Sequence, residues 1–292
     1  MLIDTHCHLN FKAFQGREKA VIERANKVGV ERFIVPGTDL VTSASAVKQS
    51  QQNQQIFATV GLHPHHVYQY HHVSSAKQQL RQDLKKIKQL LDNTRVVAIG
   101  EVGIDKYYYR DTKYTKYVVD EHFVALQKQA LVEQMKLALE YDKALILHNR
   151  QGIEDLLPLL EQNWDKKLSG GTVFHCCEAD ERLLDFAIKH QIYIGIDGDL
   201  SWSRKKQRFI QKVPLKQLVL ETDSPYLKPK LNSNWPKPVE YPETLTNEEF
   251  NEPKSITIIR DLVAYFRQTE PSEIEKQTTQ NATQLFRLTT TI

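Results

Sequence analysis

The sequence has few cysteines, no long apolar run and no strong excess of charge. Its three cysteines, Cys7, Cys176 and Cys177, form no CxxC pair and are far sparser than in disulfide-rich secreted domains, so we expect free thiols in a reducing compartment. No segment reaches the roughly 18 consecutive apolar residues of a membrane helix, and the first residues lack the basic and apolar regions of a secretory signal. These absences predict a cytoplasmic protein without membrane contact.

The charge balance is close to even, with 39 Lys and Arg against 36 Asp and Glu. The resulting net charge of +3 is too small to require a nucleic-acid partner by itself. The hydrophobic fraction of 40% is average for soluble proteins and allows a sizeable core. Since 292 residues suit one (β/α)8 barrel, and no repeat, linker or low-complexity tract divides them, we expect a single domain over 1–292.

Eight short apolar runs recur along the chain. They are rich in β-branched residues and do not alternate with polar ones, which is typical of strands buried on both faces of a parallel sheet. The runs cover residues 2–3, 32–35, 56–60, 96–99, 144–147, 172–174, 192–196 and 218–220. Amphipathic segments long enough for crossover helices lie between them, at 17–28, 75–92, 118–141, 152–163 and 178–190.

This repeated strand and helix pattern predicts a (β/α)8 TIM barrel of the α/β class, and a doubly wound open sheet is the competing architecture. Residues 224–253 contain six of the eleven prolines and no clear period, so we expect a long loop after strand eight. Two further helical patterns follow at 255–266 and 272–288. We expect these helices to close the outside of the barrel.

Side chains that commonly bind metals follow the predicted strands. They are His6 and His8 after the first run, His63 after the third, Glu101 after the fourth, His148 after the fifth, His175 after the sixth and Asp223 after the eighth. Each one alone is compatible with a structural role, such as a core histidine or a helix cap. In a barrel, however, the C-terminal strand ends meet at one mouth, so together they predict a metal site at that face.

Six short motifs in a fixed order carry a family resemblance. They are Asp4-Thr-His6-Cys-His8-Leu, Gly61-Leu-His63-Pro-His65, Gly100-Glu101-Val-Gly-Ile-Asp105, Leu147-His148-Asn-Arg150, His175-Cys and Glu221-Thr-Asp223-Ser-Pro-Tyr-Leu. Along the whole chain this order resembles the TatD family of metal-dependent deoxyribonucleases. Related amidohydrolases are similar in layout but have a carbamylated lysine at strand four, where this chain has Glu101.

The resemblance implies two divalent metal ions at the barrel mouth. The implied first set is His6, His8, Glu101 and Asp223, and the implied second set is Glu101, His148 and His175. A shared carboxylate agrees with simple chemistry, because two cations about 3.5–4 Å apart need an anion between them. These ligand types suit zinc, manganese or magnesium.

The implied activity is phosphoester hydrolysis by a metal-activated water, most simply as an exonuclease-type deoxyribonuclease acting on DNA. Asp223 and Glu101 are the expected catalytic carboxylates, and His63 is expected to hydrogen-bond the phosphoryl oxygen. His65 and Arg150 are expected to bind substrate. One alternative is an ester or amide hydrolase, such as a D-aminoacyl-tRNA deacylase. Another is a nucleic-acid-binding module with a vestigial site, which the complete ligand set disfavours. The oligomeric state stays open, a monomer included.

Two segments depart from the family pattern. Cys177-Glu178-Ala179 replaces the usual Phe-Ser-Gly, and the usual Arg-Gly is absent ahead of Asn251-Glu252-Pro253. The missing arginine removes a bidentate phosphate donor. The candidate replacements, each of which also reads as a solvated surface charge, are Arg150, Arg204, Lys228 and Lys230. The tyrosines at 107–109 either stack against a base or pack beneath their own loop.

Overall fold

Eight parallel strands form one sheet in the computed structural model, which describes residues 1–230 and 250–288. Neighbours in the chain are neighbours in the sheet. The first and last strands meet as well, because the Thr5 amide donates to the Leu220 carbonyl and Cys7 pairs with Ser224. The strands are β1 (Leu2–Asp4), β2 (Val30–Pro36), β3 (Ile56–Val60), β4 (Val96–Asp105), β5 (Ala144–Arg150), β6 (Thr172–Phe174), β7 (Tyr193–Ile196) and β8 (Leu218–Leu220). The predicted (β/α)8 barrel is confirmed, and the open sheet is wrong.

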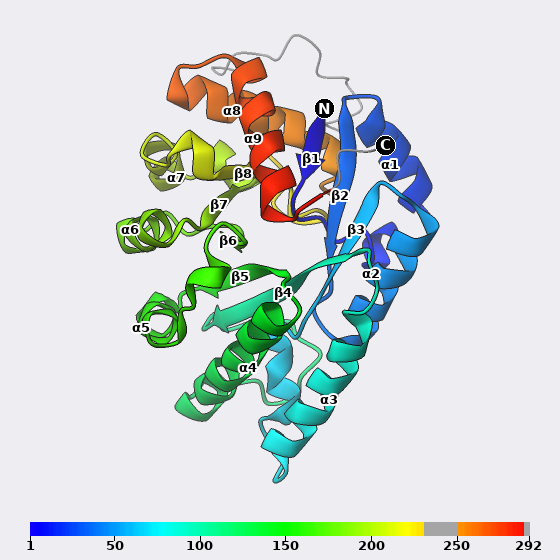
Figure 1. Cartoon of the computed structure of the whole chain (residues 1–292), viewed down its shortest axis with the longest axis vertical. Helices are drawn as coiled ribbons and strands as arrows, with labels where there is room; N and C mark the ends of the chain where they lie inside the picture. Colours follow the sequence, from blue (N-terminus) through cyan, green and yellow to red (C-terminus); the bar gives the residue numbers. More distant parts are fainter. Residues whose placement is uncertain (231–249, 289–292) are drawn as a thin grey trace.

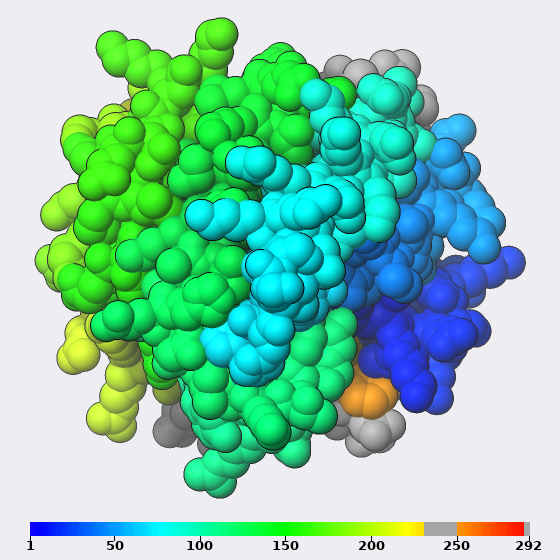
Figure 2. Space-filling model, turned by 90° about the horizontal axis from the view of Figure 1, so that it is seen from below, coloured from blue at the N-terminus to red at the C-terminus, as the bar shows by residue number. Residues whose placement is uncertain are grey.

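Helices alternate with the strands and surround the barrel (Figure 1). They are α1 (Glu18–Asn26), α2 (Leu40–Gln52), α3 (Ala76–Leu90), α4 (Glu121–Glu140), α5 (Ile153–Asn163), α6 (Glu181–His190), α7 (Arg204–Phe209), α8 (Ile256–Arg267) and α9 (Pro271–Leu285). Figure 2 shows one side of the molecule, where helices cover the barrel and α3 lies between α2 and α4. The sequence prediction did not name α2 and α7. The start of α2 was readable, since Asp39 and Thr42 form a capping box there.

One layer of apolar side chains fills the barrel near the start of its strands. The strands supply Ile3, Ile34, Phe57, Ala98, Ala144, Ile146, Val173, Tyr193 and Val219, and the end of the chain adds Ala282, Leu285, Phe286 and Leu288. Helix α9 therefore packs against this end of the barrel and contacts β1 and β8. The C-terminal strand ends remain for a functional site, which is where TIM barrels carry theirs.

Strand β4 is longer than predicted and contains a register irregularity between Ile99 and Val102. Side chains alternate along a regular strand, so the inward position of Ala98 would turn Glu101 outward. The irregularity reverses this, because Val102 packs in the outer core and Glu101 faces the barrel interior. Gly100 permits the close approach, since a Cβ there would lie 2.6 Å from the Cβ of Ile146. Such a local shift is how a bulge re-aims a functional side chain.

The predicted loop after strand eight lies partly outside the described residues, because only Ser224 to Lys230 and Phe250 to Pro253 belong to them. The three cysteines are free, as expected, and Cys7 packs in the core between two histidines that point the other way. Within residues 1–230 and 250–288, no helix combines the length and the apolar character needed to cross a bilayer.

Candidate active site

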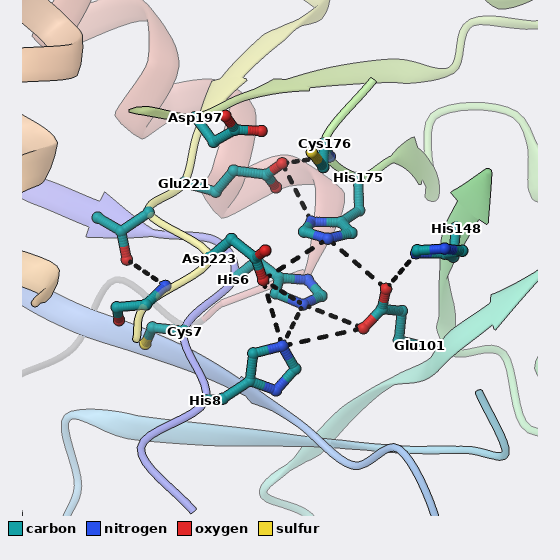
Figure 3. Close-up of polar contacts among 12 residues, drawn as sticks. His6, Cys7, His8, Glu101, His148, His175, Cys176, Asp197, Glu221 and Asp223 are labelled. Atoms are coloured by element: carbon teal, nitrogen blue, oxygen red, sulfur yellow. Dashed lines mark hydrogen bonds and ion pairs between the residues drawn. The ribbon is translucent and has the colours of Figure 1, made fainter. Parts of the chain in front are cut away.

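Side chains from the C-terminal ends of five strands converge at the barrel mouth. Figure 3 shows these six side chains pointing toward one another. They are His6 and His8 after β1, Glu101 on β4, His148 on β5, His175 after β6 and Asp223 after β8. Only His148 and Asp223 keep appreciable access to solvent, with 13% and 14% of their side-chain surface exposed. The structure therefore brings together all six residues that the sequence analysis proposed as metal ligands.

The Glu101 carboxylate stands between two groups of imidazoles. Its Oε2 lies 3.4 Å from Nε2 of His6 and 4.0 Å from Nε2 of His8. Its Oε1 lies 2.6 Å from Nδ1 of His148 and 3.6 Å from Nε2 of His175. Burial alone would raise the pKa of Glu101, yet the surrounding imidazoles hold it well below its ordinary value. A permanently ionised carboxylate with its oxygens turned to different partners can bind two cations.

His6, His8 and Asp223 form a compact donor set with Oε2 of Glu101. The two Nε2 atoms of His6 and His8 are 3.3 Å apart. Oδ1 of Asp223 lies 3.7 Å from Nε2 of His6 and 3.2 Å from Nε2 of His8. Ligands on a tetrahedral ion with bonds of about 2.1 Å are about 3.4 Å apart, so these spacings fit a divalent metal ion.

His148 and His175 form the second donor set with Oε1 of Glu101, and their ligand atoms all lie within 4.8 Å of one another. Asp105 faces the other nitrogen of the same ring, with a carboxylate oxygen 3.4 Å from Nε2 of His148. Burial disfavours the charged imidazole, but the carboxylates of Glu101 and Asp105 outweigh it and raise the pKa of His148 to about 10. The surroundings therefore favour positive charge at this position, as a metal site requires.

Asp223 occupies a special backbone position at the mouth. Its φ of 50° is in the left-handed region, which the short polar side chain of aspartate tolerates better than most residues. Its amide donates to the carbonyl of His6 at 2.9 Å, which fixes the direction of the carboxylate. Burial raises the pKa of Asp223 to about 6. A carboxylate with this pKa is well suited to accept a proton near neutral pH.

Two buried carboxylates that the sequence interpretation did not assign hold the donor sets in place. Glu221 Oε1 lies 3.1 Å from Nδ1 of His175 and accepts a hydrogen bond from the Cys176 amide. Asp4 accepts from the amide of Thr222 at 3.0 Å and from its hydroxyl at 2.6 Å, which ties β1 to β8. Both precede a metal-ligand candidate by two residues, and that spacing was the available signal for them.

We predict that Glu221→Gln weakens metal binding about tenfold. The amide oxygen still reaches Nδ1 of His175, but without charge it fixes the ring and its tautomer less firmly, and such partners are typically worth 10- to 100-fold in affinity or activity. The measurement is a calorimetric metal titration of the variant. Glu270→Gln, an exposed control on the outside of the barrel, should match the wild type. Unchanged affinity in Glu221→Gln would remove Glu221 from this supporting role.

A second group of buried charges lies near Glu221, and its positive charge comes from the Lys206 side chain. Lys206 Nζ lies 3.2 Å from Asp197, 2.7 Å from Asp199 and 3.9 Å from the Cys176 sulfur. Cys176, Asp197 and Asp199 have the spacing of a metal cluster, but the ammonium group already supplies the positive charge among them. The positive charge of Lys206 therefore balances the carboxylates of this cluster, which lies beside Glu221.

The two residues predicted to bind substrate have different surroundings. Arg150 is exposed, its guanidinium lies 4.0 Å from the ring centre of Tyr107, and it donates to the Tyr109 hydroxyl at 3.0 Å. His65 has both ring nitrogens near side chains of the β4 loop, at 2.9 Å from Thr112 and 3.4 Å from Tyr117. Burial lowers the pKa of His65 to about 4, so the ring is neutral at physiological pH.

Residues at and beside the two departures from the family pattern make structural contacts here. Glu178 accepts hydrogen bonds from the Asn149 side chain at 2.5 Å and from the Gln151 amide at 3.0 Å. It therefore fixes the strand end that carries Arg150 between those two residues. Farther along, the Glu252 carboxylate accepts hydrogen bonds from Nε and Nη2 of Arg24, at 2.9 and 2.7 Å. The Asn-Glu-Pro segment is thus anchored to α1.

The barrel and its histidine and carboxylate donor sets define the protein as a metal-dependent hydrolase. The chain belongs to the family described as TatD related DNase, which matches residues 3–287. It is 30% identical over 291 residues to a "3'-5' ssDNA/RNA exonuclease TatD" of Edwardsiella piscicida, covering 98% of this chain and 100% of that protein. It is 29% identical to the "Uncharacterized metal-dependent hydrolase YabD" of Bacillus subtilis, covering 99% and 100%.

Among solved structures, that of YjjV, a TatD homologue from Escherichia coli, superposes with a TM-score of 0.80 at 26% identity. The match covers 99% of this chain and 98% of that one. The family resemblance inferred from the six motifs is therefore confirmed over nearly the whole sequence. Membership favours a metal-dependent nuclease over the ester or amide hydrolase alternative.

Proposed function

We propose that the protein is a two-metal exonuclease that removes nucleotides from the 3′ end of single-stranded DNA or RNA. The observation that carries the proposal is the Glu101 carboxylate, whose two oxygens face two separate donor sets. Relatives of nearly full length bear the name of a 3′–5′ exonuclease for single-stranded DNA and RNA, which supports the choice of substrate. The first set is His6, His8, Glu101 and Asp223, and the second is Glu101, His148 and His175.

Divalent cations held by these residues would supply Lewis acidity that lowers the pKa of the attacking water and balances the charge of the phosphoryl oxygens. Asp223 accepts the proton of that water on its carboxylate, since its pKa of about 6 keeps it ionised at neutral pH. His63 donates a hydrogen bond to a phosphoryl oxygen in this proposal. Its Nδ1 accepts from the His65 amide at 3.0 Å, so the neutral ring carries its proton on Nε2, which lies 3.4 Å from Oε1 of Glu101.

Arg150 binds a phosphate of the substrate in this proposal. Contact with Tyr107 and Tyr109 orders its guanidinium, while its exposed edge stays available for a bidentate pair. This assigns to Arg150 the phosphate contact that the absent Arg-Gly leaves open. His65 acts indirectly, because its ring lies 4.6 Å from that of Tyr109 and helps to hold the loop on which Arg150 rests.

Chelation should abolish cleavage of a 5′-labelled single-stranded oligonucleotide, because the donor sets alone provide no Lewis acid. Adding manganese, magnesium or zinc should restore a ladder of products shortened from the 3′ end. Parallel reactions contain an oligonucleotide with a blocked 3′ end, an aminoacyl-tRNA and a small chromogenic phosphodiester. Cleavage that persists in metal-free protein would contradict the metal mechanism. Hydrolysis of the aminoacyl-tRNA without cleavage of the oligonucleotide would favour the acyl hydrolase instead.

A further inference from the structure

An exposed tryptophan and a lysine form a fixed unit on the rim of the barrel, outside the donor sets. Trp202, in the loop after β7, is 39% exposed, and Nζ of Lys230, in the loop after β8, lies 5.1 Å from its ring centre. The Lys230 amide also donates to the Ser201 hydroxyl at 2.8 Å. Gly198 packs so tightly that a Cβ there would lie 1.9 Å from the Leu227 carbonyl oxygen. The two loops are therefore held together beneath Trp202 and Lys230.

Positive charge gathers around this tryptophan. Arg204 and Lys205 follow it in the chain and are exposed, as is Lys230. Within residues 1–230 and 250–288, these three cations have no carboxylate at ion-pair distance, whereas the neighbouring Lys206 is buried and paired with Asp197. We name the four residues Trp202, Arg204, Lys205 and Lys230 the Trp202 surface. It combines a flat apolar face with cations that have no ion-pair partner within the described part of the chain, which suits a base and the phosphates beside it.

The Trp202 surface and the Tyr107 and Arg150 pair occupy different parts of the barrel rim. In a ring of eight strands β8 is four positions from β4, so the loop that carries Lys230 stands opposite the β4 loop that carries Tyr107. Strand β7, which precedes Trp202, is only two positions from β5, which carries Arg150. Tyr226 lies between Asp223 and Lys230 in the chain. It lies in the same loop as Lys230, is 54% exposed, and has its ring centre 6.3 Å from that of His8. Two places on the rim therefore each pair an aromatic ring with a cation, the first being Tyr107 with Arg150 and the second Trp202 with Lys230.

We propose that the Trp202 surface binds the part of a single-stranded nucleic acid that extends from the metal site over β7 and β8. Trp202 stacks on one base, and Arg204 and Lys230 contact the flanking phosphates. Bases in a duplex are stacked and paired within the helix, so a ring such as Trp202 selects a strand with free base faces. This inference rests on the proposed nuclease function and adds a position remote from the scissile phosphate.

The first test measures binding of a fluorescent ten-nucleotide single strand in the presence of chelator, so that nothing is cleaved. Trp202→Ala should weaken binding about 5- to 100-fold, the range for loss of one stacked base, and Trp202→Phe should restore most of it. A double variant, Arg204→Ala with Lys230→Ala, should reduce the slope of log Kd against log salt by about 0.7 for each cation removed. Tyr265→Ala, at a similarly exposed aromatic on α8, is the matched control and should bind like the wild type.

The second test compares cleavage of the same strand with hydrolysis of a small chromogenic phosphodiester, both with metal present. Trp202→Ala should raise KM for the strand and lower the ratio of its kcat/KM to that for the small ester, since the ester is too short to reach Trp202. Equal binding by Trp202→Ala and wild type, or an equal loss on both substrates, would overturn the inference. Tryptophan-dependent binding without cleavage by the wild type would instead contradict the proposed nuclease function and leave the binding surface standing.

Discussion

Asp223→Asn should lower turnover at least about 100-fold while the metal ions stay bound. Asparagine keeps an oxygen that can coordinate, but it cannot accept a proton near neutral pH, and general bases typically contribute 10²–10⁴-fold. The position of Asp223 suits both a ligand role and a proton-accepting role. Its Oδ1 lies 3.2 Å from Nε2 of His8, and 14% of the side chain is exposed to solvent. Substrate affinity should change little, since the lost interaction is used mainly in the transition state.

The measurement for Asp223→Asn is single-turnover cleavage of a labelled single strand at saturating metal, beside a titration of metal occupancy. Asp185→Asn makes the same chemical change at an exposed position on α6 and should leave turnover unaltered. If Asp223→Asn keeps turnover within a few-fold with full metal occupancy, Asp223 is a ligand only. The next candidate for the proton acceptor would then be His63, 3.4 Å from Glu101.

Glu101→Gln should lower activity and metal content together. A neutral amide offers one oxygen and one nitrogen that carries protons, so it bridges two cations poorly and leaves their positive charge unbalanced. The loss should reach both donor sets, because Oε1 and Oε2 of Glu101 serve different imidazoles. His148→Ala, by contrast, should empty the second set and spare the first, since His148 contacts only Oε1.

Metal content after dialysis, measured by mass spectrometry of the elements, separates these cases. The expected order is two ions in the wild type, one in His148→Ala and fewer than one in Glu101→Gln. Glu270→Gln, which changes an exposed glutamate on the outer surface, should retain both ions and full activity. Two bound ions with normal cleavage in Glu101→Gln would show that the carboxylate does not bridge them.

The geometry within the strands explains why the sequence located most of the candidate site. On β5, alternation turns His148 and Arg150 to the same face as Ala144 and Ile146, which fill the barrel. The same period carries Val219, in the filling layer, to Glu221 and Asp223. Parallel strands also align their C-terminal ends, so residues that follow different strands meet without further information.

Contacts between loops that are distant in the sequence could not be predicted from strand alternation. The sequence offered two readings for the tyrosines at 107–109, and the structure shows Tyr107 against the guanidinium of Arg150, which comes from another strand. His65 was expected at the substrate, yet its ring nitrogens contact Thr112 and Tyr117. Such pairings depend on how loops of unrelated sequence pack over the mouth, and no local period encodes that packing.

The eight strands, most of the crossover helices and the candidate metal-binding side chains at one end of the barrel could be read from the amino-acid sequence alone. These follow from local periodicity and from the requirement that a parallel sheet bury both faces. Only the tertiary structure decided that Glu101 faces inward, because the irregularity in β4 reverses the alternation expected from Ala98. It also decided which oxygen of Glu101 faces which imidazole, since that geometry is set by five strands packed around one axis.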